Sequence, residues 1–587
     1  MRRYISFAAA LMACAAVNAQ NLNPTVQVTN DYEGKPMEVE KKNVGMAVPD
    51  SLLKFDWNFN YSVFDNPYKG AYEFSPYKIE MKPGATVRDN GMFYLRAGAG
   101  YSLHPEAQAV FTPKIKGRFG LSVYDDFNGY SGLYHNVTAI QPASGPYTIG
   151  PYGDYSGYGF SNRAGTTLRY DAPSAVITLD GGFDLLRTKD VLASGNNAMG
   201  GSAVLRARSI GQSRFLYDVS LGWNGLGNKV KTQAISSAFD EKYEEYDAGL
   251  DARLVYRFAD RHSLHFEPSF HHVVFREQAG SATSEALDIV PSYAFSDGPF
   301  SVRLGVRFSN VWRNGDYSGE VPLYKGRRFY PEARMYYEAI PERLTLTAKF
   351  VGGQRFNTYH SYLESNRHLS MISSWQYGGM TGDVTVNTFD AGIGVSGRMR
   401  SRFQYSAEAG YARFYNAPMD AVGSLYFASL TSSSTVYVPV INMVNYDLMY
   451  ATFKGDYSSD RIDASAVFNL RYSDLHPEAE KGYSAVGLPL FSGSASFVYN
   501  WNRRVFAGLV ADWATGREGE NVYSSYGNTF DCRVPGWVDL GVTAEYRLNK
   551  RFSLWAEGRN LLNQTVMRNF MVSEKGPYFT AGICLNF

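Results

Sequence analysis

Apolar and polar residues alternate with a period of two along many short stretches of the chain. The stretch 246–258 places Tyr246 and Leu250 on one side and Asp247 on the other, and the stretch 462–472 repeats the pattern. This alternation predicts β-strands with one apolar and one polar face. Aromatic residues stand at both ends of the apolar faces, with small or aliphatic residues between them, which favours contact with lipid over burial in a two-sheet core.

The last ten residues, 578–587, form the clearest of these stretches and end on a phenylalanine. One face would carry Phe579, Ala581, Ile583, Leu585 and Phe587, and the other Tyr578, Thr580, Gly582, Cys584 and Asn586. An aromatic terminal residue that closes such a strand resembles the ending of bacterial outer-membrane barrels. We therefore expect Phe579, Ile583, Leu585 and Phe587 to form an outer-membrane targeting strand that the barrel assembly machinery binds.

Connections between the strands alternate between short and long, as expected when one rim faces the periplasm and the other the outside. Ten turn-like stretches are short and polar: 116–117, 172–174, 211–213, 260–261, 296–298, 341–342, 400–401, 459–460, 502–503 and 549–550. Ten turns join ten pairs of strands, and the first and last strands bring the count to about 22. The predicted fold is an all-β, antiparallel transmembrane barrel that spans residues 91–587.

The beginning of the chain has the features of a secretory signal peptide. Arg2 and Arg3 precede an apolar stretch, and a small-residue site predicts cleavage after Ala19. A rival lipoprotein-type cut before Cys14 is less consistent with a barrel, which needs no lipid anchor. Residues 20–90 then form an N-terminal segment in the periplasm or the barrel lumen.

Composition and charge narrow the class of protein. Aromatic residues make up 15% of the chain, and tyrosine and glycine are abundant, as in β-barrels with interface aromatics and tight turns. No later stretch reaches the roughly 20 apolar residues of a membrane-spanning helix. The formal net charge of +1 argues against nucleic acid as a partner.

Three long connections are candidates for recognition, because loops on a rigid scaffold usually carry binding residues. Residues 127–160 are rich in Tyr, Gly and Pro, residues 354–384 contain several His and Met, and residues 415–444 are rich in Ser and Thr. The candidate ligand contacts are Tyr155, Tyr158 and Trp375. A purely solvated role for these loops is the alternative.

The polar faces of the predicted strands carry charges of both signs. They include Arg96, Asp247, Asp251, Arg253, Arg257, Lys349, Glu408, Asp512, Asp539, Glu545, Glu557 and Arg559. Such a mixture predicts ion pairs that stiffen the wall rather than strong selectivity for anions or cations.

Catalytic and metal chemistry find little support. No G-x-S-x-G, H-E-x-x-H or P-loop pattern occurs, and the adjacent His271 and His272 must point to opposite faces of a strand. A metal site at His360, His368 and Met371 lacks tight ligand spacing. Cys532 and Cys584 are not expected to form a disulfide. We predict neither an enzyme nor a bound cofactor.

The carboxyl-terminal part resembles a known family. Residues 534–587 include a P-G entry to a strand, a short turn, the run Asn560-Leu561-Leu562-Asn563 and a final amphipathic strand. This is similar to the closing strands of TonB-dependent receptors, which are 22-stranded barrels. The resemblance implies an outer-membrane location in a Gram-negative bacterium and uptake of a bulky nutrient.

The amino-terminal part departs from that family. Residues 20–90 supply only 71 residues, whereas the resemblance implies a plug of well over a hundred. Two fragments are similar to family motifs: Thr25, Val26, Val28 and Thr29 lie in a TonB-box-like run, and residues 79–84 resemble the end of a plug. The segment is either a reduced plug or an unrelated periplasmic arm.

Two functions follow from these observations. The first is a transporter or channel that takes in a bulky nutrient recognised by aromatic outer loops, and binding of a TonB-like energiser to residues 20–54 would favour it. The second is a scaffold that anchors a periplasmic or surface partner protein in an envelope complex. In both cases the outward strand faces contact outer-membrane lipid.

Overall fold

The computed structural model describes residues 92–140, 147–189, 195–211, 213–234, 237–277, 280–315, 326–367, 383–400, 402–428, 433–476, 485–523 and 529–587. The predicted signal peptide, the segment 20–90 and its TonB-box-like residues lie outside this part of the chain, so they stay predictions. Trp375, His368 and Met371 also lie outside it.

Strands dominate the described residues. The first twelve are β1 (Phe93–Gly100), β2 (Glu106–Phe111), β3 (Phe119–Ile140), β4 (Tyr147–Asp171), β5 (Ala175–Lys189), β6 (Gly195–Ser209), β7 (Phe215–Ala234), β8 (Ser237–Ala259), β9 (His262–Glu277), β10 (Gly280–Asp297), β11 (Phe300–Gly315) and β12 (Gly326–Ile340). They are followed by β13 (Leu344–Phe356), the helix α3 (Tyr359–Ser365), β14 (Val384–Met399), β15 (Phe403–Ala428), β16 (Ser433–Ser458), β17 (Ile462–His476), β18 (Ala485–Val486), β19 (Phe491–Trp501), β20 (Val505–Ala514), β21 (Arg517–Tyr523), β22 (Thr529–Val534), β23 (Trp537–Arg547), β24 (Phe552–Arg559) and β25 (Tyr578–Asn586).

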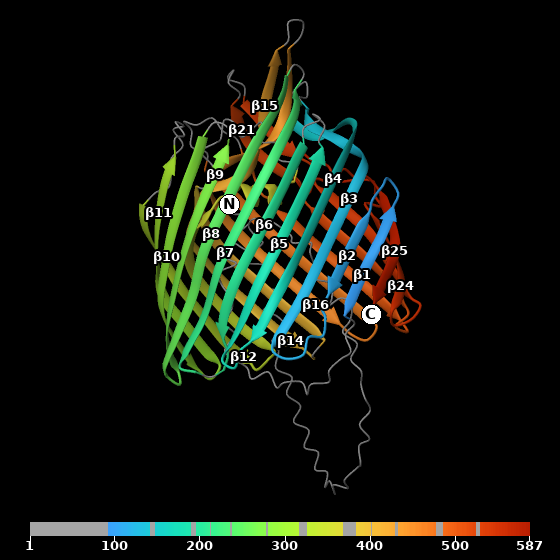
Figure 1. The fold of residues 1–587 in the computed structure, drawn as a ribbon. Helices are drawn as coiled ribbons and strands as arrows, with labels where there is room; N and C mark the ends of the chain where they lie inside the picture. The colour runs from blue at the N-terminus through green and yellow to red at the C-terminus, as the bar shows by residue number, and fades with distance from the viewer. Residues whose placement is uncertain are drawn as a thin grey trace, which may run out of the picture. The chain divides into compact units, whose positions relative to one another are not determined.

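Twenty-two of these strands form a closed antiparallel barrel (Figure 1). Consecutive strands pair along the ring, and β1 pairs with both β2 and β25, which closes it. The remaining three strands, β18, β21 and β22, pair with one another outside the ring, and β22 runs parallel to the start of β4. The predicted fold class and strand number are confirmed.

All ten predicted short turns join consecutive strands of the ring, from β2–β3 to β23–β24. Several have a residue with a positive φ, such as Glu342 at 61° and Asn502 at 52°, which a tight turn requires. These turns share one rim, at the lower edge of Figure 1, and the longer connections share the other. By the asymmetry of outer-membrane barrels, the rim with the short turns is periplasmic.

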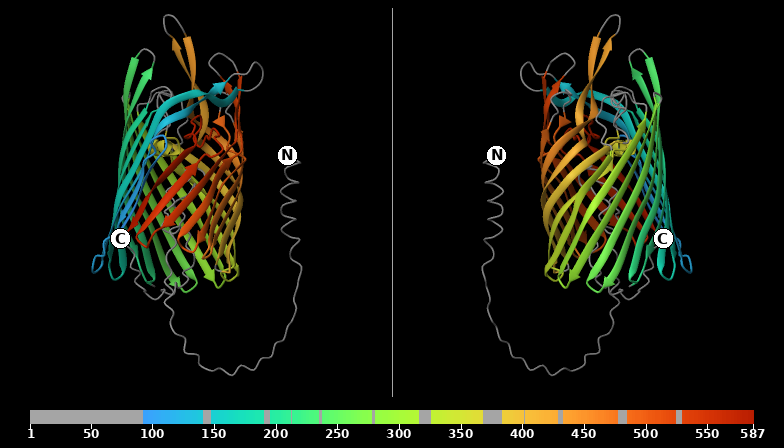
Figure 2. Two further views of the ribbon diagram at one scale, coloured as in Figure 1. Left: turned by 90° about the vertical axis from the view of Figure 1, so that its right-hand side faces the viewer. Right: turned by 90° about the vertical axis from the view of Figure 1, so that its left-hand side faces the viewer.

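Two of the three long connections are strands over most of their length, which corrects the prediction of loops. Strands β3 and β4 pair from Phe119↔Tyr170 to Ile140↔Thr148, and β15 and β16 pair as far as Ala428↔Ser433. Tyr, Val and Thr favour extended backbone, so these segments continue the hairpins beyond the wall of the barrel. Figure 2 shows the β15–β16 hairpin standing above the outer rim.

The two faces of the wall differ as the alternation predicts. On β8, Leu250 and Tyr256 are each 47% exposed on the outer face, whereas Glu245 on the inner face is 3% exposed. On β25, Phe579 and Ile583 point outward and Thr580 is buried on the inner face. The orientation agrees with the targeting prediction, and the targeting role itself stays a prediction. Within the described residues, no helix has the length and apolarity needed to cross a membrane.

Candidate functional site

The inner face of the barrel is crossed by ion pairs between neighbouring strands. Lys349 on β13 places its Nζ 2.7 Å from an oxygen of Asp390 on β14 and 2.6 Å from an oxygen of Glu408 on β15. Tyr450 on β16 donates hydrogen bonds to both carboxylates. The predicted ion pairing of the wall is confirmed, because each charge of this group has a partner of opposite sign.

The helix α3 lies in the connection between β13 and β14 and packs inside the barrel. Thr358 caps it by accepting a hydrogen bond from the Ser361 N–H at 3.2 Å. The carboxylate of Glu245 on β8 accepts from the backbone N–H groups of Tyr359 and His360. A carboxylate at this end of a helix satisfies amides that have no partner within the helix.

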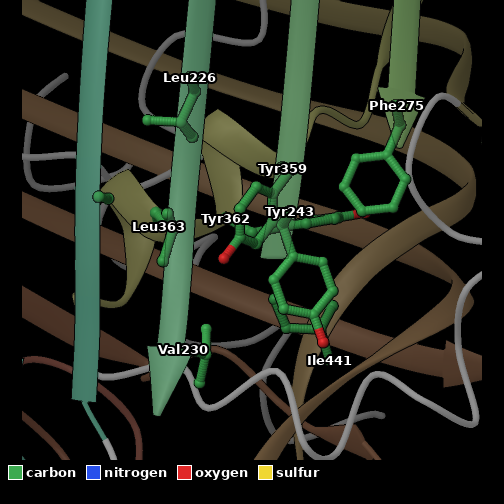
Figure 3. Close-up of a cluster of buried hydrophobic side chains, with 9 residues drawn as sticks. Leu226, Val230, Tyr243, Phe275, Tyr359, Tyr362, Leu363 and Ile441 are labelled. Carbon is green, nitrogen blue, oxygen red and sulfur yellow. The ribbon is translucent and has the colours of Figure 1, made fainter. Parts of the chain in front are cut away.

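The apolar side of α3 packs against the inner face of distant strands. Tyr359, Tyr362 and Leu363 are buried with Leu226 and Val230 of β7, Tyr243 of β8, Phe275 of β9 and Ile441 of β16. Tyr359 lies with its ring centroid 5.6 Å from that of Tyr243 and 5.8 Å from that of Phe275 (Figure 3). Such aromatic groups stabilise a contact beyond the area they bury, by about 0.5–1.5 kcal/mol per pair.

Polar contacts hold α3 to the same wall. Asn228 on β7 donates to the Tyr359 hydroxyl at 2.6 Å, and Asn196 on β6 donates to the Arg367 carbonyl at 3.0 Å. Glu364 lies 3.6 Å from Arg163 on β4 and 3.3 Å from His360. α3 follows β13 in the chain and is bound to β4 and β6–β9, so this connection turns inward and lies against the inner face of neighbouring parts of the wall.

The connection between β24 and β25 forms a second set of contacts at the outer rim. Met567, Phe570 and Met571 are buried with Val137 and Ile149 of the β3–β4 hairpin, together with Val486, Cys532 and Val534 of the outer strands β18 and β22. Arg568 of this connection reaches Asp512 at 2.8 Å and Asp539 at 2.5 Å on the inner wall. The two carboxylates raise the pKa of Arg568 and keep it charged. Both connections thus bind inward rather than projecting freely.

The predicted contact residues Tyr155 and Tyr158 do not form one site. They are three positions apart on β4, and in a strand residues an odd number apart face opposite sides. Tyr155 faces inward and stacks on Tyr134 at 5.5 Å, whereas Tyr158 lies on the outer face beside Phe160. Only Tyr155 faces the lumen, and the role of the two tyrosines as ligand contacts stays a prediction.

Other chemistry weighed from the sequence finds no support in the described residues. His271 on β9 lies 3.6 Å from Asp247 and 3.4 Å from Asp251 on β8, as part of the ion pairing of the wall. His272 lies on the other face, 3.1 Å from Glu285. In the described part of the chain no group of three metal-ligating residues comes together. Both Cys532 and Cys584 are free thiols.

Sequence reasoning missed the residues that hold α3. Glu245 and Asn228 are single polar residues on the inner faces of strands, with no motif around them. The one local signal was the Thr358 cap before Tyr359-His360-Ser361, which is typical of a helix start. Their roles depend on contacts between residues more than a hundred positions apart.

Comparison with known proteins agrees with this architecture. No family model and no curated protein matches the chain. Among solved structures, the FrpB iron transporter from Neisseria meningitidis is similar with a TM-score of 0.61 at 11% identity, over 85% of this chain and 82% of that one. The ferric-catecholate import receptor Fiu from E. coli K12 gives 0.60 at 9% identity, over 85% and 82%. The copper transporter OprC gives 0.57 at 12% identity, over 84% and 80%.

At these identities the comparison establishes the fold. The chain has the barrel of the TonB-dependent receptors, as its carboxyl-terminal motif implies, and this is the architecture of a Gram-negative outer-membrane protein. The prediction that residues 20–90 form a reduced plug concerns residues outside the described part of the chain.

Proposed function

We propose that this protein is an outer-membrane receptor that imports a bulky solute through the lumen of its barrel. The supporting observation is that α3 lies inside the barrel and is bound to the inner faces of β8, β7 and β4 through Glu245, Asn228 and Arg163. A passive pore has no need of such an obstruction, whereas a gated importer does. The solved structures with the same fold are transporters and receptors, so we propose no enzymatic activity.

The energy source that we propose is a TonB-like protein that binds residues 20–30 from the periplasm. The TonB-box-like run of Thr25, Val26, Val28 and Thr29 supports this proposal. The start of the first strand supports it as well, because β1 begins at the rim with the short turns. An extended segment of this kind can add to the edge of a partner's sheet through backbone hydrogen bonds.

The solute would enter from the outside between α3 and the aromatic inner wall of the β3–β4 hairpin. Tyr155 lies on that wall and stacks on the buried Tyr134, and Arg163 of β4 is bound to α3 through Glu364. Aromatic rings with a few fixed polar groups are typical of ligand pockets.

Conductance separates an occluded importer from a passive pore. We would record single-channel currents in KCl from the mature chain starting at Gln20 and from a chain starting at residue 91. Silence of both chains would support occlusion by α3, whereas a silent mature chain and a conducting truncated chain would mean that residues 20–90 block the lumen instead. Large conductance from both chains would contradict occlusion by α3.

A binding experiment tests the energy source separately. We expect a purified TonB carboxyl-terminal domain to bind the mature chain, and the variant V26P/V28P to lose at least tenfold in affinity, because proline removes two backbone donors. The matched control is V44P, with the same substitution outside the TonB-box-like run. Equal binding by all three proteins, or no binding to the mature chain, would favour the scaffold function over import.

A further inference from the structure

A group of basic residues lies on the outer face of β5–β9, beyond the apolar belt that faces lipid. On β7 the outward residues run from Leu221 and Trp223, at 55% and 46% exposure, to the exposed Lys229 toward the outer rim. On β8 they run from Leu250 and Tyr246 to the exposed Lys242. The outward side chains thus change from apolar to cationic toward the outer rim, where the hydrocarbon core of a membrane ends and the headgroup region begins.

The register of the strands aligns these cations in a row. Arg187 on β5 lies opposite Asn197 on β6, Asn197 lies opposite Lys229 on β7, and Lys229 lies opposite Lys242 on β8. Arg187 Nε donates to Asn197 Oδ1 at 3.1 Å. Neighbouring strands are about 4.8 Å apart, so the row spans roughly 15 Å around the barrel. Figure 1 shows β5–β9 side by side on the face toward the viewer.

The row carries net positive charge. Lys189 on β5 and Arg276 on β9 lie on the same outward face as the row. Among the described outward side chains at the outer end of β5–β9 there is one carboxylate, that of Glu244, and it pairs with Lys242. Five cations and one carboxylate give a formal charge of 5 − 1 = +4. Tyr158 and Phe160, opposite Lys189 and Arg187, continue the group with aromatic rings of the kind that lie at membrane interfaces.

The opposite side of the barrel differs at the corresponding level. There the outward Arg413 is held by Asp447 in a two-bond pair, with Nε–Oδ1 at 2.7 Å and Nη2–Oδ2 at 2.9 Å. Asp474 lies directly opposite Asp447, so this group has a formal charge of 1 − 2 = −1. The group on β15–β17 therefore lacks the net positive charge of the group on β5–β9.

We propose that the outer face of β5–β9 binds the phosphate groups of an anionic glycolipid of the outer leaflet. At this level a lipid-facing side chain meets headgroups, and ammonium and guanidinium groups bind phosphate oxygens through charge-assisted hydrogen bonds. The acyl chains of the same lipid would pack on the belt formed by residues such as Phe183, Leu221 and Leu250, which is continuous with the row. The site is independent of the lumen and of import.

The test uses the mature chain folded in a non-ionic detergent and bis-phosphorylated lipid A as the probe. We expect R187Q/K229Q/K242Q to weaken binding of the probe roughly 100-fold, from the usual contribution of a basic residue near an anionic surface. The matched control, K116Q/R214Q/K550Q, removes one arginine and two lysines from the periplasmic rim. We expect the control to stay within twofold of the wild type.

Three further measurements make the result decisive. Enzymatically dephosphorylated lipid A should bind to the wild type as weakly as the intact probe binds to the triple variant. Inorganic phosphate at millimolar concentration should not displace the probe, because it lacks acyl chains. The single variant K229Q, with a fold verified by heat-modifiable mobility, should lose roughly fivefold. Equal binding by wild type and triple variant, or equal binding of intact and dephosphorylated lipid, would overturn the proposal.

Discussion

At the scale of the residue, Lys575 is the buried cation that joins the β24–β25 connection to the seam of the barrel. Its ammonium lies 5.3 Å from the ring centroid of Tyr130 and 5.0 Å from that of Tyr578, and it contacts Nε2 of His104. Burial lowers the pKa of His104 to about 4, so the imidazole is neutral and Nε2 accepts from Lys575. Burial, opposed mainly by the neighbouring Glu574 and Glu106, lowers the pKa of Lys575 to about 8.

This pKa predicts a dependence of stability on pH. Between pH 8 and the ordinary lysine pKa near 10.5, the unfolded chain binds more protons than the folded one, so the free energy of unfolding should rise with pH. We expect a rise of about 1–3 kcal/mol in urea titrations from pH 7.5 to pH 10 that is absent in K575M. The exposed-turn variant K550M should behave as the wild type, and a parallel rise in K575M would show that other groups cause it.

At the scale of the element, α3 shows how a helix of seven residues stays ordered in a barrel. So short a helix has little stability of its own in water. Its order comes from the cap at Thr358, the carboxylate of Glu245 and the burial of Tyr359, Tyr362 and Leu363 against strands far away in sequence. The helix therefore depends on the wall that it contacts, and weakening those contacts should release it.

The variant Y359A/Y362A/L363A tests this dependence. Each truncation of a buried side chain costs about 2–5 kcal/mol, so α3 should leave the wall while the strands of the barrel stay paired. We expect trypsin to cleave after Arg367, whose carbonyl is bound by Asn196 in the intact protein, and we expect new conductance in planar bilayers.

The matched control for the helix is S361A/S365A, because both hydroxyls donate only to carbonyl groups of the same turn. It should resist trypsin and remain as silent as the wild type. If trypsin cleaved the control and the triple variant no faster than the wild type, the aromatic packing would not be what holds the helix.

At the scale of the whole molecule, closure of the ring depends on the seam between β1 and β25. Seven residue pairs join them, from Tyr94↔Asn586 to Gly100↔Thr580. Gly582 lies at the middle of this seam, where a Cβ would stand 2.0 Å from the carbonyl oxygen of Ala97 and 2.5 Å from Cα of Gly98. These backbone atoms of β1 leave no room for a side chain.

We therefore expect G582A to impair closure of the barrel. The added methyl group should destabilise the folded state by about 1–3 kcal/mol, as overpacking does, and lower the yield of heat-modifiable barrel on refolding. The control is G576A, since a Cβ at Gly576 meets nothing within 4 Å. Refolding of G582A with the yield and urea midpoint of the wild type would contradict this account of the seam.

The sequence by itself determined the wall of the barrel. Alternation such as that of residues 246–258, the ten short turns and the aromatic carboxyl-terminal strand predict the strands, their outward faces and a ring of about 22. These features are local, because the period of two and the turn residues act over a few positions. The N–L–L–N motif at residues 560–563 added the resemblance to the receptor family, which the fold bears out.

The tertiary structure alone decided what happens inside and around the wall. Glu245 becomes the partner of α3, Tyr155 stacks on Tyr134, and Arg187, Lys229 and Lys242 align in one row. Each depends on strand register or on contacts within the lumen, between residues tens to more than a hundred positions apart. No pattern along the chain encodes such pairings, because they form only when the ring closes.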